Sequence, residues 1–336
     1  MDPRKRRTAA PPARGKGPEP LPSPSTQNTP LASASSPDLP ETPVGTSHNR
    51  ARSGPVISSE SGFPRAPSPV EDVSGDEAVM DFKNKVALIT GGAGGIGKAY
   101  AEELLKLGAK VSICDLDEEN GELLAQQFNH LYGHNRTIFC LCDVTDYPQF
   151  EAAFQTTSSV FGGLDIVVNN AGIFNDRFWE LEVDVNLNGV IRGTLLALRF
   201  MGRDRGGRGG TVVITGSTLG LRPCACVPIY TATKHAIIGF TRSFGDPFHM
   251  NLSGVRIIAL CPGSTCTENN PEDMKKGILS PAYEPVWRKE YENRPFQPVQ
   301  NVGRALIHVL VKGTSGSIWT VDNQNPPREV KFTSSP

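Results

Sequence analysis

Short apolar runs alternate with helical segments between residues 85 and 322, and this alternation limits the possible folds more than any other feature. Each run, such as KVALIT at 85–90, is apolar almost throughout and rich in β-branched residues, which is typical of strands covered on both faces. Strands of this kind separated by helices predict a parallel sheet with helices on both sides. The expected strands cover residues 85–90, 110–115, 136–144, 164–172, 210–217, 254–263 and 316–322.

Helical periodicity fills the segments between these runs. The expected helices cover residues 97–109, 118–132, 179–202, 229–246 and 299–313, with a further helix around Phe150 and Val160. We therefore predict an α/β fold, a Rossmann-like doubly wound parallel sheet of seven strands with helices on both faces. Ligands of such sheets bind outside the carboxyl ends of the strands, and the unusual residues of this chain fall there.

The composition changes sharply near residue 80. Residues 1–80 hold 15 of the 28 prolines, many serines and a single aromatic residue, Phe63. Such a segment buries too little apolar surface to offset its ordering entropy, so we predict a disordered Pro/Ser-rich tail. Residues 81–336 have the composition and length of a single domain. The tail begins with a basic PRKRR run, which is compatible with nuclear import or with a solvated arm, and Met80 is a possible alternative start.

Several classes of protein are disfavoured. The formal net charge of −1 gives no reason to expect nucleic acid as a partner. No apolar run has the roughly 18 to 20 residues that cross a bilayer, and no apolar segment follows the charged N-terminus as in a secretory signal. Seven cysteines without a C-x-x-C pair favour a reducing, cytoplasmic compartment. Neither C-x-C pair has further ligands nearby, so we expect no metal site.

A glycine-rich turn, TGGAGGIG at 90–97, follows the first strand and opens a helix. Glycines there allow a tight turn and a close approach to a pyrophosphate, and the helix N-terminus offers free N–H groups. Asp115 ends the second strand, where a carboxylate accepts hydrogen bonds from a ribose diol and repels a 2′-phosphate. Leu116 rather than a basic residue follows it, so we predict NAD rather than NADP. Asp143, after the third strand, is a candidate for holding the adenine amino group.

Ser217 ends the fifth strand, and Tyr230 and Lys234 lie four residues apart on the next helix. A free Tyr has a pKa of about 10, and a nearby ammonium favours its phenolate, so we expect Lys234 to lower the pKa of Tyr230. Tyr230 would then be a general acid/base, with Ser217 orienting the substrate oxygen and Lys234 also holding the nicotinamide ribose. Asn186 is polar within an apolar helix and is expected to hold a water that links Lys234 to solvent. Asn170, beside Asn169, is expected to be a structural amide with one cofactor contact.

The motifs TGGAGGIG, NNAG, YTATK and PGSTCT, with Asn186 and Ser217, resemble those of the short-chain dehydrogenase/reductase superfamily, in the same order over about residues 81–325. Within it, YTATKHAIIGFTRS and SGVRIIALCPG look like the NAD-dependent 15-hydroxyprostaglandin dehydrogenases. GSIWTVD is also similar to the insect-type alcohol dehydrogenases.

The resemblance implies a catalytic tetrad, a set of NAD contacts and a homodimer formed through the helices at 179–202 and 229–246. The implied tetrad is Ser217, Tyr230, Lys234 and Asn186. The implied NAD contacts are Gly91, Gly95, Ile96, Gly97, Asp115, Leu116, Cys142, Asp143, Val144, Asn170, Tyr230, Lys234, Thr265 and Thr267.

Two positions depart from the family pattern. Val227 stands where prostaglandin-type members carry a Gln that helps to hold the substrate hydroxyl, and Pro247 should end or kink a helix that is usually continuous. Residues 264–298, rich in proline, are expected to form a lid over the substrate.

We expect NAD-dependent oxidation of a secondary alcohol, possibly lipid-derived, to a ketone. The alternatives are an insect-type alcohol dehydrogenase, a carbonyl reductase, or a noncatalytic dinucleotide-binding scaffold or storage protein.

Overall fold

The computed structural model describes residues 80–267, 274–291 and 294–332. The predicted tail and its basic run, and parts of the predicted lid, lie outside the described residues. Within them, no helix combines the length and the apolar character needed to cross a membrane.

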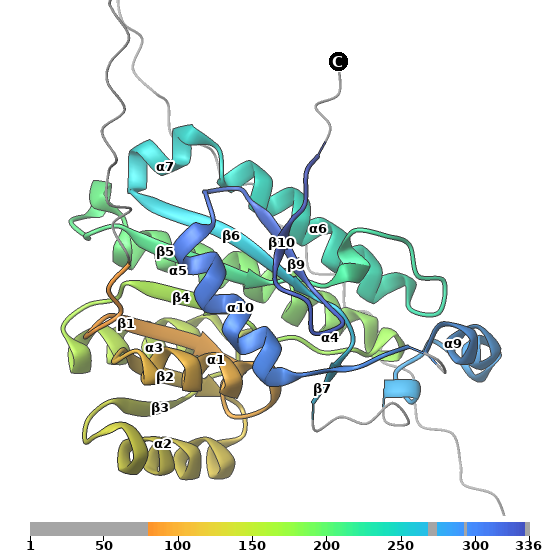
Figure 1. Cartoon of the computed structure of the whole chain (residues 1–336), viewed down its shortest axis with the longest axis horizontal. Coiled ribbons are helices and arrows are strands. Elements are labelled where there is room, and N and C mark those ends of the chain that lie inside the picture. Colours follow the sequence, from red (N-terminus) through yellow and green to blue (C-terminus); the bar gives the residue numbers. More distant parts are fainter. Residues whose placement is uncertain (1–79, 268–273, 292–293, 333–336) are drawn as a thin grey trace, which may run out of the picture. The chain divides into compact units, whose positions relative to one another are not determined.

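Eight strands form the central sheet in the order β10-β9-β6-β5-β4-β1-β2-β3 (Figure 1). Seven of them pair in parallel, so the predicted fold class is confirmed. The strand count was wrong, because β10 adds an antiparallel edge to β9. β10 consists of only two residues, Arg328 and Glu329, and these charged side chains form no apolar pattern that could predict a strand. The strands are β1 (Val86–Thr90), β2 (Lys110–Asp115), β3 (Thr137–Leu141), β4 (Ile166–Asn169), β5 (Gly210–Thr215), β6 (Val255–Pro262), β9 (Ile318–Val321) and β10 (Arg328–Glu329).

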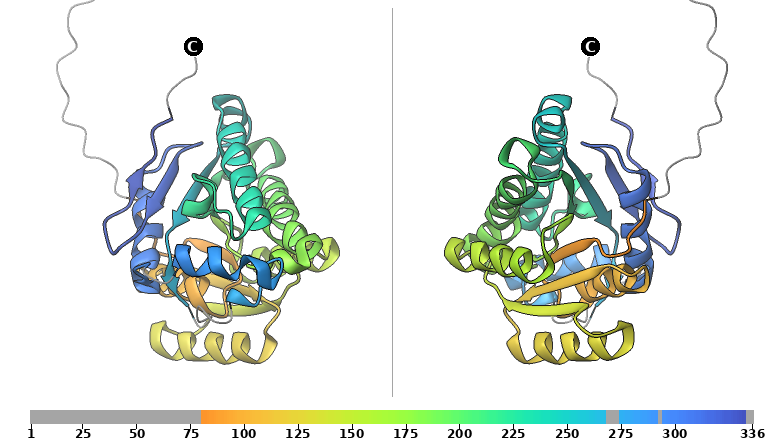
Figure 2. Two further views of the ribbon diagram at one scale, coloured as in Figure 1. Left: turned by 90° about the vertical axis from the view of Figure 1, so that its right-hand side faces the viewer. Right: turned by 90° about the vertical axis from the view of Figure 1, so that its left-hand side faces the viewer.

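Helices cover both faces of the sheet, with α1 and α10 on one side and α5 and α6 on the other (Figure 2). A second, two-stranded sheet pairs β7 (Thr265–Cys266) with β8 (Gln297–Pro298). The helices are α1 (Gly95–Lys106), α2 (Glu118–Tyr132), α3 (Tyr147–Phe161), α4 (Trp179–Val183), α5 (Val190–Met201), α6 (Pro228–Phe244), α7 (Pro247–Ser253), α9 (Glu284–Tyr291) and α10 (Val299–Lys312).

The central strands β1, β2, β4, β5 and β6 divide their side chains between two cores. Ala87 and Ile89 of β1 pack into the cluster beneath α1, α2 and α10, whereas Val86 and Leu88 pack into the cluster beneath α3, α5 and α6. This division explains why the strand is apolar at every position, since successive side chains of a strand point to opposite faces.

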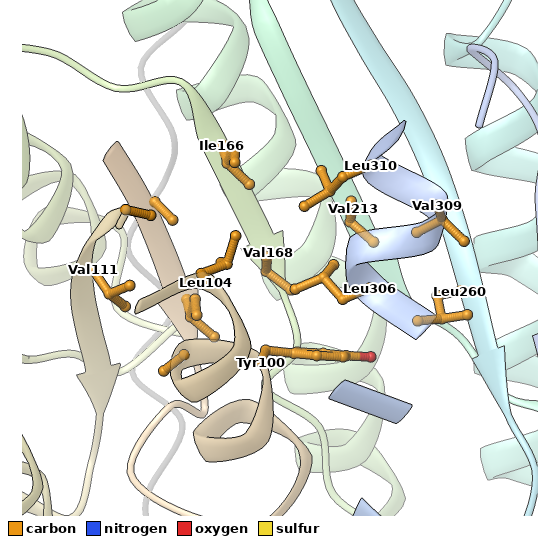
Figure 3. Packing of buried hydrophobic residues seen from close by; sticks show 14 of the residues in the cluster. Tyr100, Leu104, Val111, Ile166, Val168, Val213, Leu260, Leu306, Val309 and Leu310 are labelled. Carbon is orange, nitrogen blue, oxygen red and sulfur yellow. The ribbon is translucent and has the colours of Figure 1, made fainter. Parts of the chain in front are cut away.

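Figure 3 shows the first core, where Tyr100 and Leu104 of α1 lie close to Val168 of β4 and Leu306 of α10. All four side chains are completely buried. Full burial of one such side chain contributes about 1.5–3 kcal/mol. This packing fixes the N-terminal end of α1 against the carboxyl ends of the strands.

Two helical predictions change in detail. The segment expected to be one helix over 179–202 contains α4, a π-helical turn η2 (Asp184–Gly189) and α5. The helix expected over 229–246 ends at Phe244, and Pro247 begins α7, whose N-terminus the Asp246 carboxylate caps through Phe248 N. Pro247 therefore ends the helix as expected, because its ring cannot continue the hydrogen-bond ladder.

Candidate active site

A cleft of about 790 Å³ opens at the carboxyl ends of the parallel strands. Its lining combines the glycine turn after β1 with residues that follow β2, β3, β4, β5 and β6. All of the predicted site residues except Gly97 and Asn186 line it. These are Gly91, Gly95, Ile96, Asp115, Leu116, Cys142, Asp143, Val144, Asn170, Ser217, Tyr230, Lys234, Thr265 and Thr267.

The glycine turn is packed so closely that side chains do not fit. Gly91 has φ +62°, and a Cβ there would lie 3.0 Å from the Ala171 Cα. A Cβ on Gly97 would lie 2.0 Å from the Gly91 carbonyl oxygen, so Gly97 serves the close packing of α1 on the turn rather than the cleft surface. No side chain caps the N-terminus of α1. The turn therefore has the shape and the free N–H groups that suit a pyrophosphate.

Asp115 is fixed by the turn that it faces. Its Oδ2 accepts a hydrogen bond of 2.9 Å from Ala93 N, and its Oδ1 accepts one of 3.2 Å from Asp117 N. Beside it, Leu116 is 64% exposed although it lines the cleft. An exposed apolar side chain next to a fixed carboxylate matches the flat base and the polar ribose of an adenosine. These residues fit a dinucleotide.

Lys98 is a residue whose position the sequence reasoning missed. It lines a polar hollow of about 310 Å³ together with Asp115 and Asp117. A 2′-phosphate placed there would meet one ammonium and two carboxylates. Lys98 lies in α1 and Asp115 at the end of β2, so they are well separated in the sequence. Only the packing of α1 against β2 brings both side chains to one hollow.

Several polar residues of the cleft also hold its walls together. Asn170 Nδ2 donates to the carbonyl oxygens of Thr90 and Gly91 at 3.0 Å each, and its Oδ1 accepts from Thr215 Oγ1 at 3.1 Å. These bonds tie the ends of β1, β4 and β5 together. The Asp143 Oδ1 accepts from the backbone N and the hydroxyl of Thr145, so that carboxylate also shapes the turn after β3.

Ser217, Tyr230 and Lys234 converge at the other end of the cleft. Lys234 is buried, donates to the Thr215 carbonyl oxygen at 3.1 Å and lies 5.5 Å from the centre of the Tyr230 ring. Burial lowers the pKa of Lys234 to about 8. Ser217 accepts from Leu219 N at 3.1 Å and lines the cleft with Tyr230, whose hydroxyl it influences. A phenol, an aliphatic hydroxyl and an amine thus line one surface.

The expected effect on Tyr230 is corrected. Burial of the hydroxyl raises its pKa above the ordinary value of 10, and the hydrogen bond with Ser217 opposes that rise without reversing it. The prediction that Lys234 would lower this pKa weighed the neighbouring charge but not desolvation. A buried phenolate is costly in an apolar surrounding, and this cost exceeds any benefit from the charge of the neighbouring Lys234.

Asn186 lies in η2, outside the cleft lining. Its Oδ1 accepts from Ile173 N and its Nδ2 donates to the Ile173 carbonyl oxygen, both at 2.8 Å. A Cβ on Gly172 would lie 3.2 Å from the Asn186 Oδ1 and 3.6 Å from the Lys234 Nζ, so the Gly172 backbone lies between the two. A π-helical turn at this point is consistent with a functional constraint, since such turns often occur at functional sites. The water role of Asn186 stays a prediction.

Two acidic residues were missed. The Asp176 carboxylate accepts from Ile229 N at 2.8 Å and from Tyr230 N at 2.9 Å, so it caps α6 from a distant segment. Glu182 is buried beside it. The sequence holds one indirect signal of this cap, because Val227 at the N-cap of α6 has no side-chain acceptor of its own.

The opposite wall of the cleft is aromatic. Phe174 packs against Tyr230 with ring centres 4.7 Å apart, and against Trp287 and Tyr291 of α9 at 5.8 and 6.4 Å. Val227 is completely buried in the same cluster and does not line the cleft. Among the described residues, no group of three His, Cys, Asp or Glu side chains gathers as a metal ion would require.

Comparison with known proteins adds four findings. The short chain dehydrogenase family profile matches residues 85–276. Mouse 15-hydroxyprostaglandin dehydrogenase [NAD(+)] is 45% identical over 55% of this chain and 68% of its own length. Alcohol dehydrogenase 2 of Ceratitis cosyra is 31% identical over 76% of this chain and 97% of its own length. Among solved structures, a short chain dehydrogenase from Burkholderia cenocepacia in complex with NADP is 28% identical with a TM-score of 0.60, over 72% of this chain and 98% of that one.

Proposed function

Since this chain belongs to the short-chain dehydrogenase family and is an oxidoreductase acting on CH–OH groups, we propose that it uses NAD⁺ to oxidise a secondary alcohol to a ketone. One observation carries this proposal. Ser217, Tyr230 and Lys234 meet at one end of a single cleft, and a glycine turn with a fixed carboxylate, Asp115, forms the other end.

Bound NAD⁺ would supply the hydride acceptor and bring a positive charge into the cleft. The chain supplies the proton chemistry. The positive charge of bound NAD⁺ would favour the Tyr230 phenolate, and in that form Tyr230 accepts the hydroxyl proton of the alcohol. Ser217 donates a hydrogen bond to the same oxygen and orients it. Lys234, whose pKa lies at about 8, exchanges protons near neutrality, so it is suited to pass on the proton that Tyr230 receives. Asn186 would act through the backbone at Gly172 that separates it from Lys234.

The charges around the ribose end support NAD over NADP. Asp115 and Asp117 place two carboxylates against the one ammonium of Lys98 in the hollow beside the glycine turn. A 2′-phosphate would enter a site with net negative charge, whereas a ribose diol would donate to the Asp115 carboxylate. The NADP complex of the Burkholderia relative shows that the family accepts either cofactor.

The aromatic wall supports an alcohol with a bulky apolar group. Phe174 and Tyr291 line the cleft with Tyr230, and Trp287 is stacked on Tyr291. The sequence identity of 45% with a 15-hydroxyprostaglandin dehydrogenase points to a lipid-derived alcohol of that kind. A small alcohol, as in the insect enzymes, would leave this wall uncovered. The described part of the segment 264–298 would cover the substrate, since Phe296 and Arg294 from it also line the cleft.

The proposal is tested by NADH production from NAD⁺ with prostaglandin E2, 4-phenyl-2-butanol and 2-propanol. We expect a higher kcat/KM for the two bulky alcohols than for 2-propanol. Tyr230→Phe should lower kcat by about 10²-fold or more, as loss of a general acid/base does. Tyr147→Phe is the control, because Tyr147 is an exposed tyrosine at the start of α3.

Two outcomes would contradict the proposal. Undiminished turnover by Tyr230→Phe would remove Tyr230 from the mechanism. Binding of NADH without turnover of any alcohol, or of the corresponding ketones in reverse, would favour a noncatalytic dinucleotide-binding protein.

A further inference from the structure

Two carboxyl groups are buried together where α6 begins. Asp176 lies in the 3₁₀ turn η1 (Asp176–Phe178) and Glu182 in α4, and both are 0% exposed. The two Asp176 oxygens accept from Ile229 N and Tyr230 N, the second and third residues of α6. The Glu182 Oε1 accepts from Asn175 N at 2.7 Å.

The second carboxyl oxygen of Glu182, Oε2, indicates which group carries a proton. Oε2 is buried and has no hydrogen-bond partner in the part of the chain that the structure describes, and the Asp176 carboxylate is a charged neighbour of the Glu182 side chain. Two ionised carboxylates cannot hydrogen-bond to each other, and both ionised in a buried site would repel strongly. A protonated Oε2 removes both difficulties, because it donates to Asp176.

The proton belongs on Glu182 rather than on Asp176. Both Asp176 oxygens accept backbone N–H groups at a helix N-terminus, and each of these interactions favours the carboxylate anion. Glu182 accepts one backbone N–H only. The pair therefore has one charge, held at the end of α6, and one proton, held between the two side chains.

We propose that Glu182 is a proton-donating positioning residue, which holds Asp176 against the N-terminus of α6 and thereby fixes Tyr230 in the cleft. The proton sharing rests on the burial of both carboxyl groups and on the Glu182 oxygen that has no hydrogen-bond partner among the described residues. The positioning of Tyr230 for chemistry rests on the proposed function.

Other charged groups face the pair. Tyr230 and Lys234 of α6 both interact electrostatically with Glu182, whereas Asp184 on η2 pairs with Arg192 at 2.9 Å. Burial, assisted by the neighbouring Asp176, raises the pKa of Glu182 from 4.5 to about 8. Above that pH a second negative charge would push Asp176 from the α6 N-terminus and would further raise the pKa of Tyr230.

The raised pKa also links stability to pH. A carboxyl whose pKa is raised on folding binds more protons in the folded chain, so its contribution is fully present below about pH 4.5 and is lost as pH rises through about 8. A side chain that keeps the two hydrogen bonds without titrating should remove this loss. Gln is such a side chain, since its Oε1 accepts from Asn175 N and its Nε2 donates to Asp176.

The first experiment compares thermal unfolding of the wild type, Glu182→Gln and Glu180→Gln between pH 5 and pH 8.5. Glu180 lies on the same helix but is exposed. Glu180→Gln therefore makes the same chemical change on the same helix without altering the buried pair of carboxyl groups. We expect the Tm of Glu182→Gln to rise relative to the wild type by about 3 °C or more over this range, and Glu180→Gln to follow the wild type. Parallel curves for all three proteins would overturn the shared proton.

The second experiment measures kcat/KM for 4-phenyl-2-butanol with NAD⁺ at pH 7 and pH 9. In the wild type and in Glu180→Gln, the ratio of the pH 9 to the pH 7 value should be at least threefold lower than in Glu182→Gln. Equal ratios, with the expected Tm result, would overturn the positioning of Tyr230. If the chain turns over no alcohol at all, the proposed function fails, and the unfolding curves still decide whether the pair shares a proton.

Discussion

At the scale of single residues, the charges at the ribose end of the cleft set the cofactor preference that we propose. Asp115 is held in place by Ala93 N and Asp117 N, so it cannot turn away from a phosphate without losing both hydrogen bonds. Lys98 is the one positively charged side chain among the described residues that line the hollow. The preference is therefore a balance of nearby charges rather than the property of one residue.

Asp115→Asn should shift this balance towards NADPH, because Asn keeps an acceptor for Ala93 N but removes one negative charge. We expect the ratio of the NADPH to the NADH dissociation constant to fall about tenfold, which corresponds to about 1.4 kcal/mol. Lys98→Gln should move the ratio in the opposite direction. Fluorescence titration with both reduced cofactors measures the ratio, and an unchanged ratio in Asp115→Asn would remove the charge of Asp115 from the explanation.

At the scale of elements, the turn between β1 and α1 is where local sequence and packing agree most closely. Gly97 carries no cleft surface, yet a side chain there would overlap the Gly91 carbonyl. Gly239 of α6 is the opposite case, since a Cβ there would meet no atom within 4 Å. Both positions are glycine, but only Gly97 lacks the space for a side chain.

Gly97→Ala should therefore destabilise the chain, with a loss of about 2 kcal/mol or more in the free energy of unfolding, as expected where backbone must shift. Gly239→Ala should stabilise it by about 0.4–1 kcal/mol, because Ala lowers the entropy of the unfolded chain and suits a helix. Chemical denaturation with both variants tests the contrast. Equal effects of the two substitutions would contradict the packing described at Gly97.

At the scale of the whole molecule, the family resemblance leads us to propose a homodimer through the helical segments 179–202 and 228–244. The exposed side of α6 carries Ala232, His235 and Gly239. A Cβ on Gly239 would meet no atom within 4 Å, so a second helix could approach this side closely. Leu195 of α5 is 49% exposed and adds an apolar side chain to the surface of that helix. Both features suit a face that packs against a second copy.

Gly239→Trp should then convert a dimer to a monomer, because the bulky ring has room in the single chain but not in a close helix pair. Analytical ultracentrifugation measures the change. Gln126→Trp on the exposed side of α2 is the matched control and should leave the mass unchanged. A dimer that survives Gly239→Trp would place the interface elsewhere.

The local pattern of the chain was enough to predict the parallel sheet, the glycine turn and the approach of Ser217, Tyr230 and Lys234. Apolar periodicity and turn residues reflect hydrogen bonding and burial within one element or between neighbours, and these are encoded locally. The strand ends were less certain, and β4 proved shorter than the run 164–172 because its polar end turns towards the cleft.

Only the tertiary structure decided how charge is distributed around these groups. The cap of α6 by Asp176 joins positions more than 50 residues apart, and neither Asp176 nor Glu182 shows in the sequence that it will be buried. The direction of the Tyr230 pKa shift was also beyond the sequence, because the shift depends on desolvation. A residue type states which charge is available, whereas burial and the neighbours brought by folding decide whether that charge is kept, shared or lost.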